Sequence, residues 1–212
     1  MAEITLSEIR FKEMVSQNKK YAELRAKHQE ELNSISSNPD YSERKKQELR
    51  VELTNQFYAD KAGEYEKAKE QFDKLTDELS KKPMLTDESA QKASILVDIV
   101  RTLGDDFNGQ VAREVIESSR GNPLAQKLLK AECKKHGRNT EAESIDNLII
   151  EDVSAECRGI KDILIRAYSD KGNMNILNSR LSTLAYKLNI PIEIEHIETE
   201  KENPNYTTMG IF

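Results

Sequence analysis

Residues 51–79 read VELTNQFYADKAGEYEKAKEQFDKLTDEL, and this stretch decides the fold. Five apolar or aromatic side chains recur in it at intervals of seven: Val51, Tyr58, Tyr65, Phe72 and Leu79. An interval of seven returns to one face of an α-helix, so the pattern predicts a long helix with an apolar seam. At 1.5 Å per residue, a helix of about 40 residues spans roughly 60 Å. A compact core cannot cover a stripe of that length, so the helix must pair with the preceding helix, with another subunit or with both.

The segment before this helix carries a second seam. Met14, Tyr21, His28 and Ile35 are also seven residues apart, and the seam is interrupted at residues 36–40, SSNPD. Pro39 disfavours a helical conformation at Asn38, and the Asn, Ser and Asp side chains suit a turn. The second helix is expected to begin at a capping box formed by Asp40 and Glu43 and to end before Pro83. Residues 1–82 are therefore predicted to form an antiparallel helical hairpin, a coiled coil, that turns at Asn38 and Pro39.

Composition supports an all-α protein. The chain has 212 residues, of which 33% are charged and 37% hydrophobic, with only 8 Gly and 5 Pro. So few turn-forming residues argue against a β-sandwich or barrel, in which turns recur about every 8–12 residues. The formal net charge is −6, which gives no general basic surface for nucleic acid. No signal peptide or membrane span is found, and Cys133 and Cys157 suit reduced thiols, so a cytoplasmic location is expected.

Residues 83–189 are predicted to form a compact module of about five helices. Thr86 or Asp87 starts the first helix, Gly104 ends it, and Pro123 and Gly137 bracket a later one. Thr140 and Glu143 form the pattern of a capping box, from which one helix is expected to continue to Leu164. Short links between such helices are typical of a small bundled domain.

Residues 190–212 form the third part, an extended acidic tail. Ile190, Ile192 and Ile194 alternate with polar residues or proline, the pattern of a single strand, and the tail has one Lys and five Glu. A strand without a mate could add to the sheet edge of a partner or lie along the helices. The tail ends on Ile211 and Phe212, which form either a docking tip for a partner or a frayed end.

No pattern of catalytic or metal-binding residues is found, so neither an enzyme nor a cofactor is expected. The three histidines lie in separate segments, and Cys133 and His136 have zinc-type spacing but lack a second pair. The chain contains no Gly-x-Ser-x-Gly motif and no glycine-rich phosphate loop.

A local basic patch is the remaining candidate for ligand binding. Lys127, Lys130 and Lys134 lie on one helical face. In a helix-turn-helix the following helix would read DNA, but that helix carries six acidic residues and would be repelled by phosphate. The patch could make a non-specific contact with nucleic acid, or it could pair with an acidic protein face or with the acidic tail.

Residues 38–50, NPDYSERKKQELR, resemble a segment of small helical proteins encoded in the head gene clusters of tailed bacteriophages. Those proteins join a charged amino-terminal coil to a modest carboxy-terminal module. The resemblance implies a virion assembly or structural role, such as a scaffold-like or minor head protein, with self-association or a coat-like partner. The alternative is a regulatory or inhibitory module that binds another macromolecule.

Overall fold

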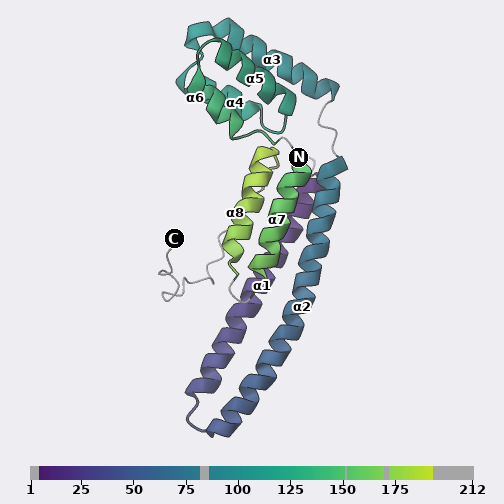
Figure 1. Cartoon of the computed structure of the whole chain (residues 1–212), viewed down its shortest axis with the longest axis vertical. Coiled ribbons are helices and arrows are strands. Elements are labelled where there is room, and N and C mark those ends of the chain that lie inside the picture. The colour runs from purple at the N-terminus through teal and green to yellow at the C-terminus, as the bar shows by residue number, and fades with distance from the viewer. Residues whose placement is uncertain (1–4, 82–85, 151, 170–171, 193–212) are drawn as a thin grey trace.

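A computed structural model describes residues 5–81, 86–150, 152–169 and 172–192 (Figure 1). These residues form eight α-helices and one 3₁₀ turn, with no strand among them, so the all-α prediction is confirmed. Within the described part of the chain, every helix is too short or too polar to cross a lipid bilayer. The α-helices are α1 (Leu6–Ser37), α2 (Glu43–Lys81), α3 (Asp87–Leu103), α4 (Gly109–Ser118), α5 (Pro123–Lys135), α6 (Asn139–Asp146), α7 (Val153–Ala167) and α8 (Met174–Lys187), and the 3₁₀ turn is Gly104–Asp106.

Helices α1 and α2 form the predicted antiparallel hairpin (Figure 1). Helix α1 ends at Ser37, and the side-chain oxygen of Asn38 accepts a hydrogen bond from the backbone N–H of Asp40 at 2.9 Å. The capping box expected at Asp40 is not the cap of α2, because the capping residue lies two positions later. The hydroxyl of Ser42 accepts from the N–H of Lys45 at 3.3 Å and therefore caps α2.

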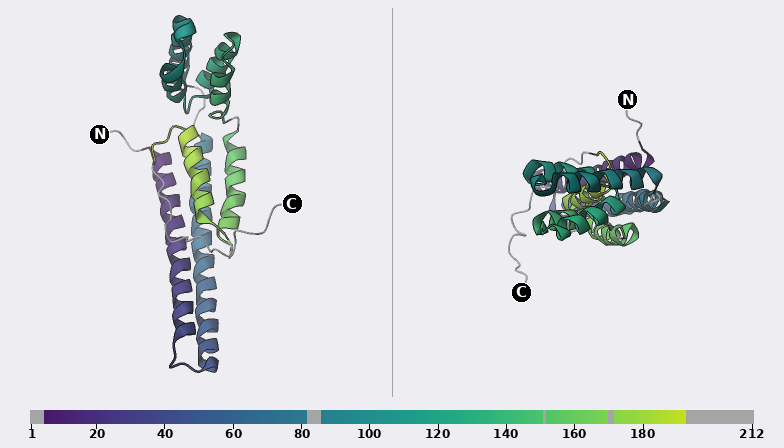
Figure 2. Two further views of the ribbon diagram at one scale, coloured as in Figure 1. Left: turned by 90° about the vertical axis from the view of Figure 1, so that its left-hand side faces the viewer. Right: turned by 90° about the horizontal axis from the view of Figure 1, so that it is seen from above.

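The hairpin is half of a four-helix bundle, which the sequence did not predict. Helix α7 lies against α2, and α8 lies against α1, over the half of the hairpin that is farther from its turn (Figure 2). The four helices share one apolar core that includes Phe11, Phe72, Leu164 and Leu181. The prediction of one compact module over residues 83–189 is therefore wrong, because the apolar faces of α7 and α8 are buried against the hairpin.

The remaining helices, α3 to α6, form a second unit with its own core. This core contains Val100, Phe107, Leu129 and Ile145. Thr86 caps α3 in a capping box with Ser89, as the sequence indicated for that start. The capping box expected at Thr140 is not formed, since α6 already begins at Asn139.

The long helix predicted from Thr140 to Leu164 is two helices. The break lies between α6 and α7, where Leu148 is buried in the core of the α3–α6 unit and Ile150 in the core of the bundle. One straight helix could not deliver these neighbouring side chains to two separate cores. The two units also meet at Gly121, whose N–H donates to the carbonyl oxygen of Lys187 at 3.0 Å.

The tail departs from the predicted strand where it is described. Ile190 is buried and Ile192 packs partly buried against the bundle core, with no strand at either residue. Ile192, which was predicted to form a docking edge with Ile194, therefore packs on the bundle instead. Ile194, Ile211 and Phe212, the other predicted docking residues, lie outside the described residues.

Gly121 provides a direct test of the contact between the two units. A Cβ atom at this position would lie 2.7 Å from the carbonyl oxygen of Leu188, whereas a Cβ at Gly137 would have no heavy atom within 4 Å. Both glycines have a left-handed φ, +70° and +71°, so alanine costs about 1–2 kcal/mol of backbone strain at either.

We expect Gly121→Ala to lower the free energy of unfolding by about 1–3 kcal/mol more than the matched control Gly137→Ala. Urea denaturation followed by circular dichroism measures the difference. Equal losses in the two variants would show that the contact between Gly121 and Leu188 does not hold the units together.

Candidate interaction surface

Helices α7 and α8 are too short to cover the whole hairpin. They contain 15 and 14 residues, against 32 in α1 and 39 in α2. At 1.5 Å per residue, the short pair covers about 20 Å of a hairpin that is nearly 60 Å long. The hairpin therefore continues beyond the bundle as two helices alone, as Figure 2 shows. Residues 26–62, which form this extension, are called the distal stem.

The boundary of the distal stem is set by the last contacts of the four-helix region. Nη1 of Arg25 donates to the carbonyl oxygen of Gly172, in the link before α8, at 2.6 Å. On the other helix, the ring of Tyr65 lies 5.8 Å from the ring of Tyr168, the residue after α7. Neither α7 nor α8 reaches farther towards the turn.

The predicted seam of α2 crosses this boundary and changes its environment there. Leu79 and Phe72 are 4% and 1% exposed in the bundle core, and Tyr65 is half-buried beside Tyr168. Tyr58 and Val51 are 48% and 56% exposed. The single chain therefore leaves this end of the predicted seam uncovered, because the seam faces α7 and α7 ends before it reaches Tyr58 and Val51.

Helix α1 has a matching stripe that the sequence analysis missed. Asn18 donates to the side chain of Asn178 in α8, and Arg25 reaches Gly172. The next residue at the interval of seven is Leu32, which is half-buried in the distal stem. Because two of its residues, Asn18 and Arg25, are polar or charged, this stripe does not form an apolar repeat in the sequence. In the predicted seam from Met14 to Ile35, Tyr21 stacks on Tyr168, and farther towards the turn His28 stacks on Phe57 of α2 with 4.1 Å between the ring centroids.

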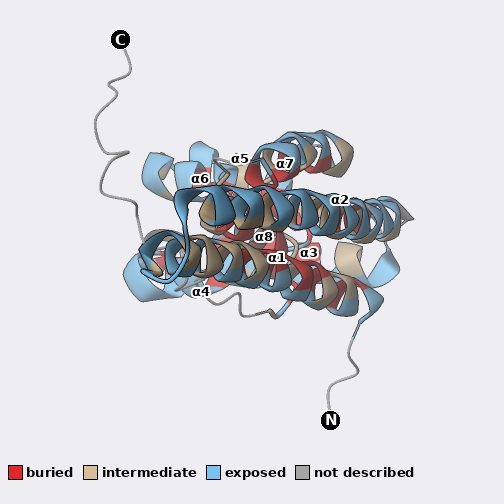
Figure 3. Ribbon diagram, turned by 90° about the horizontal axis from the view of Figure 1, so that it is seen from below, coloured by how far each residue is buried: buried red, intermediate tan, exposed pale blue. Residues whose placement is uncertain are grey.

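The two stripes give the distal stem a face without formal charge. Helical spacing places Gln29, Leu32 and Ser36 of α1 on it, together with Gln47, Val51, Thr54 and Tyr58 of α2. Arg50 lies at its inner edge, where the guanidinium donates to the hydroxyl of Ser36 at 2.9 Å. The seven residues are called the uncharged face. Figure 3 views the molecule from the turn and shows that α1 and α2 are exposed or half-buried over most of their surface.

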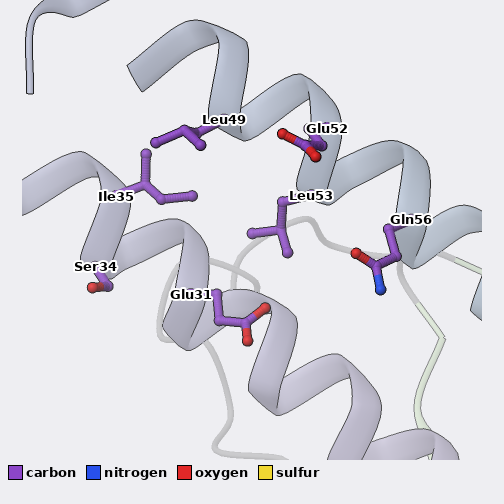
Figure 4. A pocket seen from close by; sticks show the side chains of 7 residues that line it. All are labelled: Glu31, Ser34, Ile35, Leu49, Glu52, Leu53 and Gln56. Atoms are coloured by element: carbon purple, nitrogen blue, oxygen red, sulfur yellow. The ribbon is translucent and has the colours of Figure 1, made fainter. Parts of the chain in front are cut away.

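A different side of the distal stem carries an open groove of about 320 Å³ (Figure 4). Ile35, Leu49 and Leu53 point into the space between α1 and α2, and the carboxylates of Glu31 and Glu52 lie at its rim. Leu49 is two residues from Val51, which is about 200° around the helix, so the groove does not belong to the uncharged face. The rim of the groove is acidic, and the outer edge of the uncharged face also carries charge, because Arg44, Glu48 and Glu52 line a second depression with Gln47 and Val51.

The predicted basic patch on α5 is divided by contacts within the protein. Lys127 and Lys134 are exposed, but the ammonium group of Lys130 forms an ion pair with the carboxylate of Asp146 in α6. Nearby, the Oε1 atom of Glu132 forms ion pairs with Nε of Arg101 at 3.4 Å and with Nζ of Lys135 at 3.6 Å. Two exposed lysines therefore remain of the three that were predicted to act together.

The two cysteines are buried in different cores, Cys133 in the α3–α6 unit and Cys157 in the bundle. Burial raises the pKa of the Cys133 thiol to about 11, with a further contribution from Glu141. Such a thiol is protonated at neutral pH and is a weak nucleophile and metal ligand. No group of three metal-ligating side chains occurs among the described residues.

The change of environment along the α2 seam gives a stability prediction. Phe72→Ala should lower the free energy of unfolding by about 3–5 kcal/mol, because the ring is fully buried. Tyr65→Ala should cost less, and Val51→Ala less than about 0.5 kcal/mol, because Val51 lies in solvent. Denaturation at a protein concentration that gives monomers measures all three. A large loss for Val51→Ala would mean that this end of the seam is buried in the single chain.

The distal stem should also lose stability at acidic pH through His28. Burial lowers the pKa of His28 below its ordinary value of 6.5, against a smaller opposing effect of Glu31, and Nε2 is buried without a hydrogen-bond partner among the described residues. The unfolded chain then takes up the proton first, so stability falls as the pH drops below about 6.5. Between about pH 7.5 and about pH 5.5, the wild-type chain should lose more stability than His28→Gln. Identical pH profiles of the two chains would contradict the prediction.

Comparison with known proteins gives no relative from which a role could be transferred. No family model, no curated protein and no solved structure matches the chain.

Proposed function

We propose that this chain is a non-enzymatic protein–protein interaction protein that serves as an assembly or structural component, with the distal stem as its main contact. The observation that carries the proposal is the division of the α2 seam, in which Tyr58 and Val51 are exposed although the same seam is buried at Phe72 and Leu79. Tyr58 and Val51 continue a packed stripe, so a partner helix could cover them as α7 covers Phe72 and Leu79.

The resemblance to phage head proteins supports the assembly role. It covers residues 38–50, which form the turn and the start of α2 and so make up the tip of the distal stem. A protruding helical stem on a compact base suits a scaffold-like or minor head component. In that role the chain would act in the host cytoplasm or in the virion, with a coat-like protein or further copies of itself as partners.

A regulatory module that binds nucleic acid is the alternative, and it has less support. Lys127 and Lys134 are exposed, but Lys130 is engaged by Asp146. Two lysines release few counterions from a nucleic acid, so the contact they could make would be weak and sensitive to salt.

Sedimentation velocity of the full chain, with and without duplex DNA, tests the proposal. The proposal expects species larger than the 24.2 kDa chain as the protein concentration rises, and no change on addition of DNA. A chain that remains monomeric, and that binds DNA with an affinity that falls steeply with added salt, would overturn it in favour of the alternative. Lys127→Gln combined with Lys134→Gln is the control variant, since it should abolish DNA binding only in the second case.

A further inference from the structure

We propose that the uncharged face of the distal stem binds the same face of a second copy in antiparallel orientation, so that two stems complete a four-helix bundle. This inference rests on the proposed function and names the partner of the distal stem. It follows from the fold of the stem, from its charges and from the way in which the same stripes are covered elsewhere in the chain.

The covered half of the hairpin shows what kind of element fits these stripes. There, the stripe of α2 from Tyr65 to Leu79 is covered by α7, and the stripe of α1 at Asn18 is covered by α8. An antiparallel pair of helices thus occupies the position next to α1 and α2. The distal stem presents the same two stripes at Leu32, Tyr58 and Val51, and it is itself an antiparallel pair of helices. A second stem therefore has the shape that its own stripes require.

The charges of the stem favour self-pairing. In a two-fold symmetric contact the residues near the axis meet their own copies, so a charge close to the axis would face a like charge. One third of the chain is charged, yet none of the seven residues of the uncharged face is. Charged side chains border the face, with Arg44 and Glu48 beside Gln47 and Val51 and the ammonium group of Lys61 over the ring of Tyr58, so a symmetric contact places its charges at the rim rather than at its centre.

The ends of the face also select the antiparallel orientation. Helical spacing continues the face of α2 to Glu43 near the turn and to Lys61 near the bundle. If two α2 helices cross antiparallel at Glu52, Glu43 of one copy lies opposite Lys61 of the other, and Val51 and Thr54 lie close to the two-fold axis. A parallel arrangement would instead keep Glu43 and Lys61 of the two copies at opposite ends of the contact, where they cannot pair.

Other occupants fit the face less well. The acidic tail, with one Lys and five Glu, would find no basic residue among the seven. Nucleic acid would need a basic surface for its phosphates. The cross-linking experiment distinguishes both from a second stem, because neither the tail nor nucleic acid would hold two stems together in one defined register.

Cysteine cross-linking of the full chain tests the proposed contact. Thr54→Cys places a thiol near the proposed axis, and Gln56→Cys places one on the groove side of the same helix, as a matched control. The native Cys133 and Cys157 are buried, and the wild-type chain measures their reaction. With a short bismaleimide, Thr54→Cys should give several-fold more covalent dimer than Gln56→Cys. Equal yields, or no dimer above the wild-type level, would overturn the proposal.

A mixing experiment tests the orientation. In the antiparallel register, Gln47 of one copy lies beside residues 57 and 58 of the other. A mixture of Gln47→Cys and Tyr58→Cys chains should therefore give several-fold more covalent dimer than either variant alone. A higher yield from Tyr58→Cys alone would indicate a parallel contact and would overturn the proposal.

The result is separable from the proposed function. A chain that forms larger species in sedimentation, but gives no Thr54→Cys dimer, associates through another surface, so only the inference fails. A chain that remains monomeric and binds DNA fails both tests. Circular dichroism of each cysteine variant should match the wild-type spectrum, and all the substituted positions are exposed or half-buried.

Discussion

The stacked rings of Tyr21 and Tyr168 mark the point at which four helices become two. Their centroids are 4.3 Å apart, and the hydroxyl of Tyr21 donates to the carbonyl oxygen of Tyr168 at 3.3 Å. One turn away, the buried side chains of Asn18 and Asn178 are joined at 2.7 Å. Leaving a buried polar group unpaired costs free energy. A shift of α7 and α8 along the hairpin would break these hydrogen bonds and would therefore destabilise the bundle. This register fixes where the bundle ends, and with it the length of the distal stem.

The distal stem is held by a different balance of forces from the bundle. Its inner side chains, such as Leu53 and Phe57, are only half-buried, because two helices cannot enclose them. On its surface, pairs such as Lys27–Glu31 and Arg44–Glu48 follow the i, i+4 pattern and add about 0.3–0.5 kcal/mol each. These local ion pairs support the two helices. A further pair of helices would bury the half-exposed apolar side chains and so add the hydrophobic stabilisation that the distal stem lacks. Stability and interaction therefore depend on the same residues.

The sequence predicted the elements that depend on neighbouring residues and failed where distant residues decide. The heptads and the SSNPD break predicted the hairpin, and Thr86 and Gly104 predicted the ends of α3. The sequence also predicted the apolar faces of α7 and α8, but the pattern of an apolar face does not indicate which surface it packs against. Leu148 and Ile150 enter two cores, which no local pattern reveals. For the same reason, the repeat containing Val51 and Tyr58 predicted a shared helix face but not that α7 stops short of it.

The order of the helices along the chain has a kinetic consequence. The α3–α6 unit lies between α2 and α7 in sequence, so the bundle cannot close until a long intervening segment brings α7 back to α2 (Figure 1). Closing a disordered loop costs entropy that rises by about 0.6 kcal/mol with each doubling of its length. The contacts inside the α3–α6 unit and inside the α1–α2 hairpin are closer in sequence, and contacts of this kind form faster. The α3–α6 unit and the α1–α2 hairpin therefore depend on contacts nearer in sequence than those that join α7 and α8 to the hairpin.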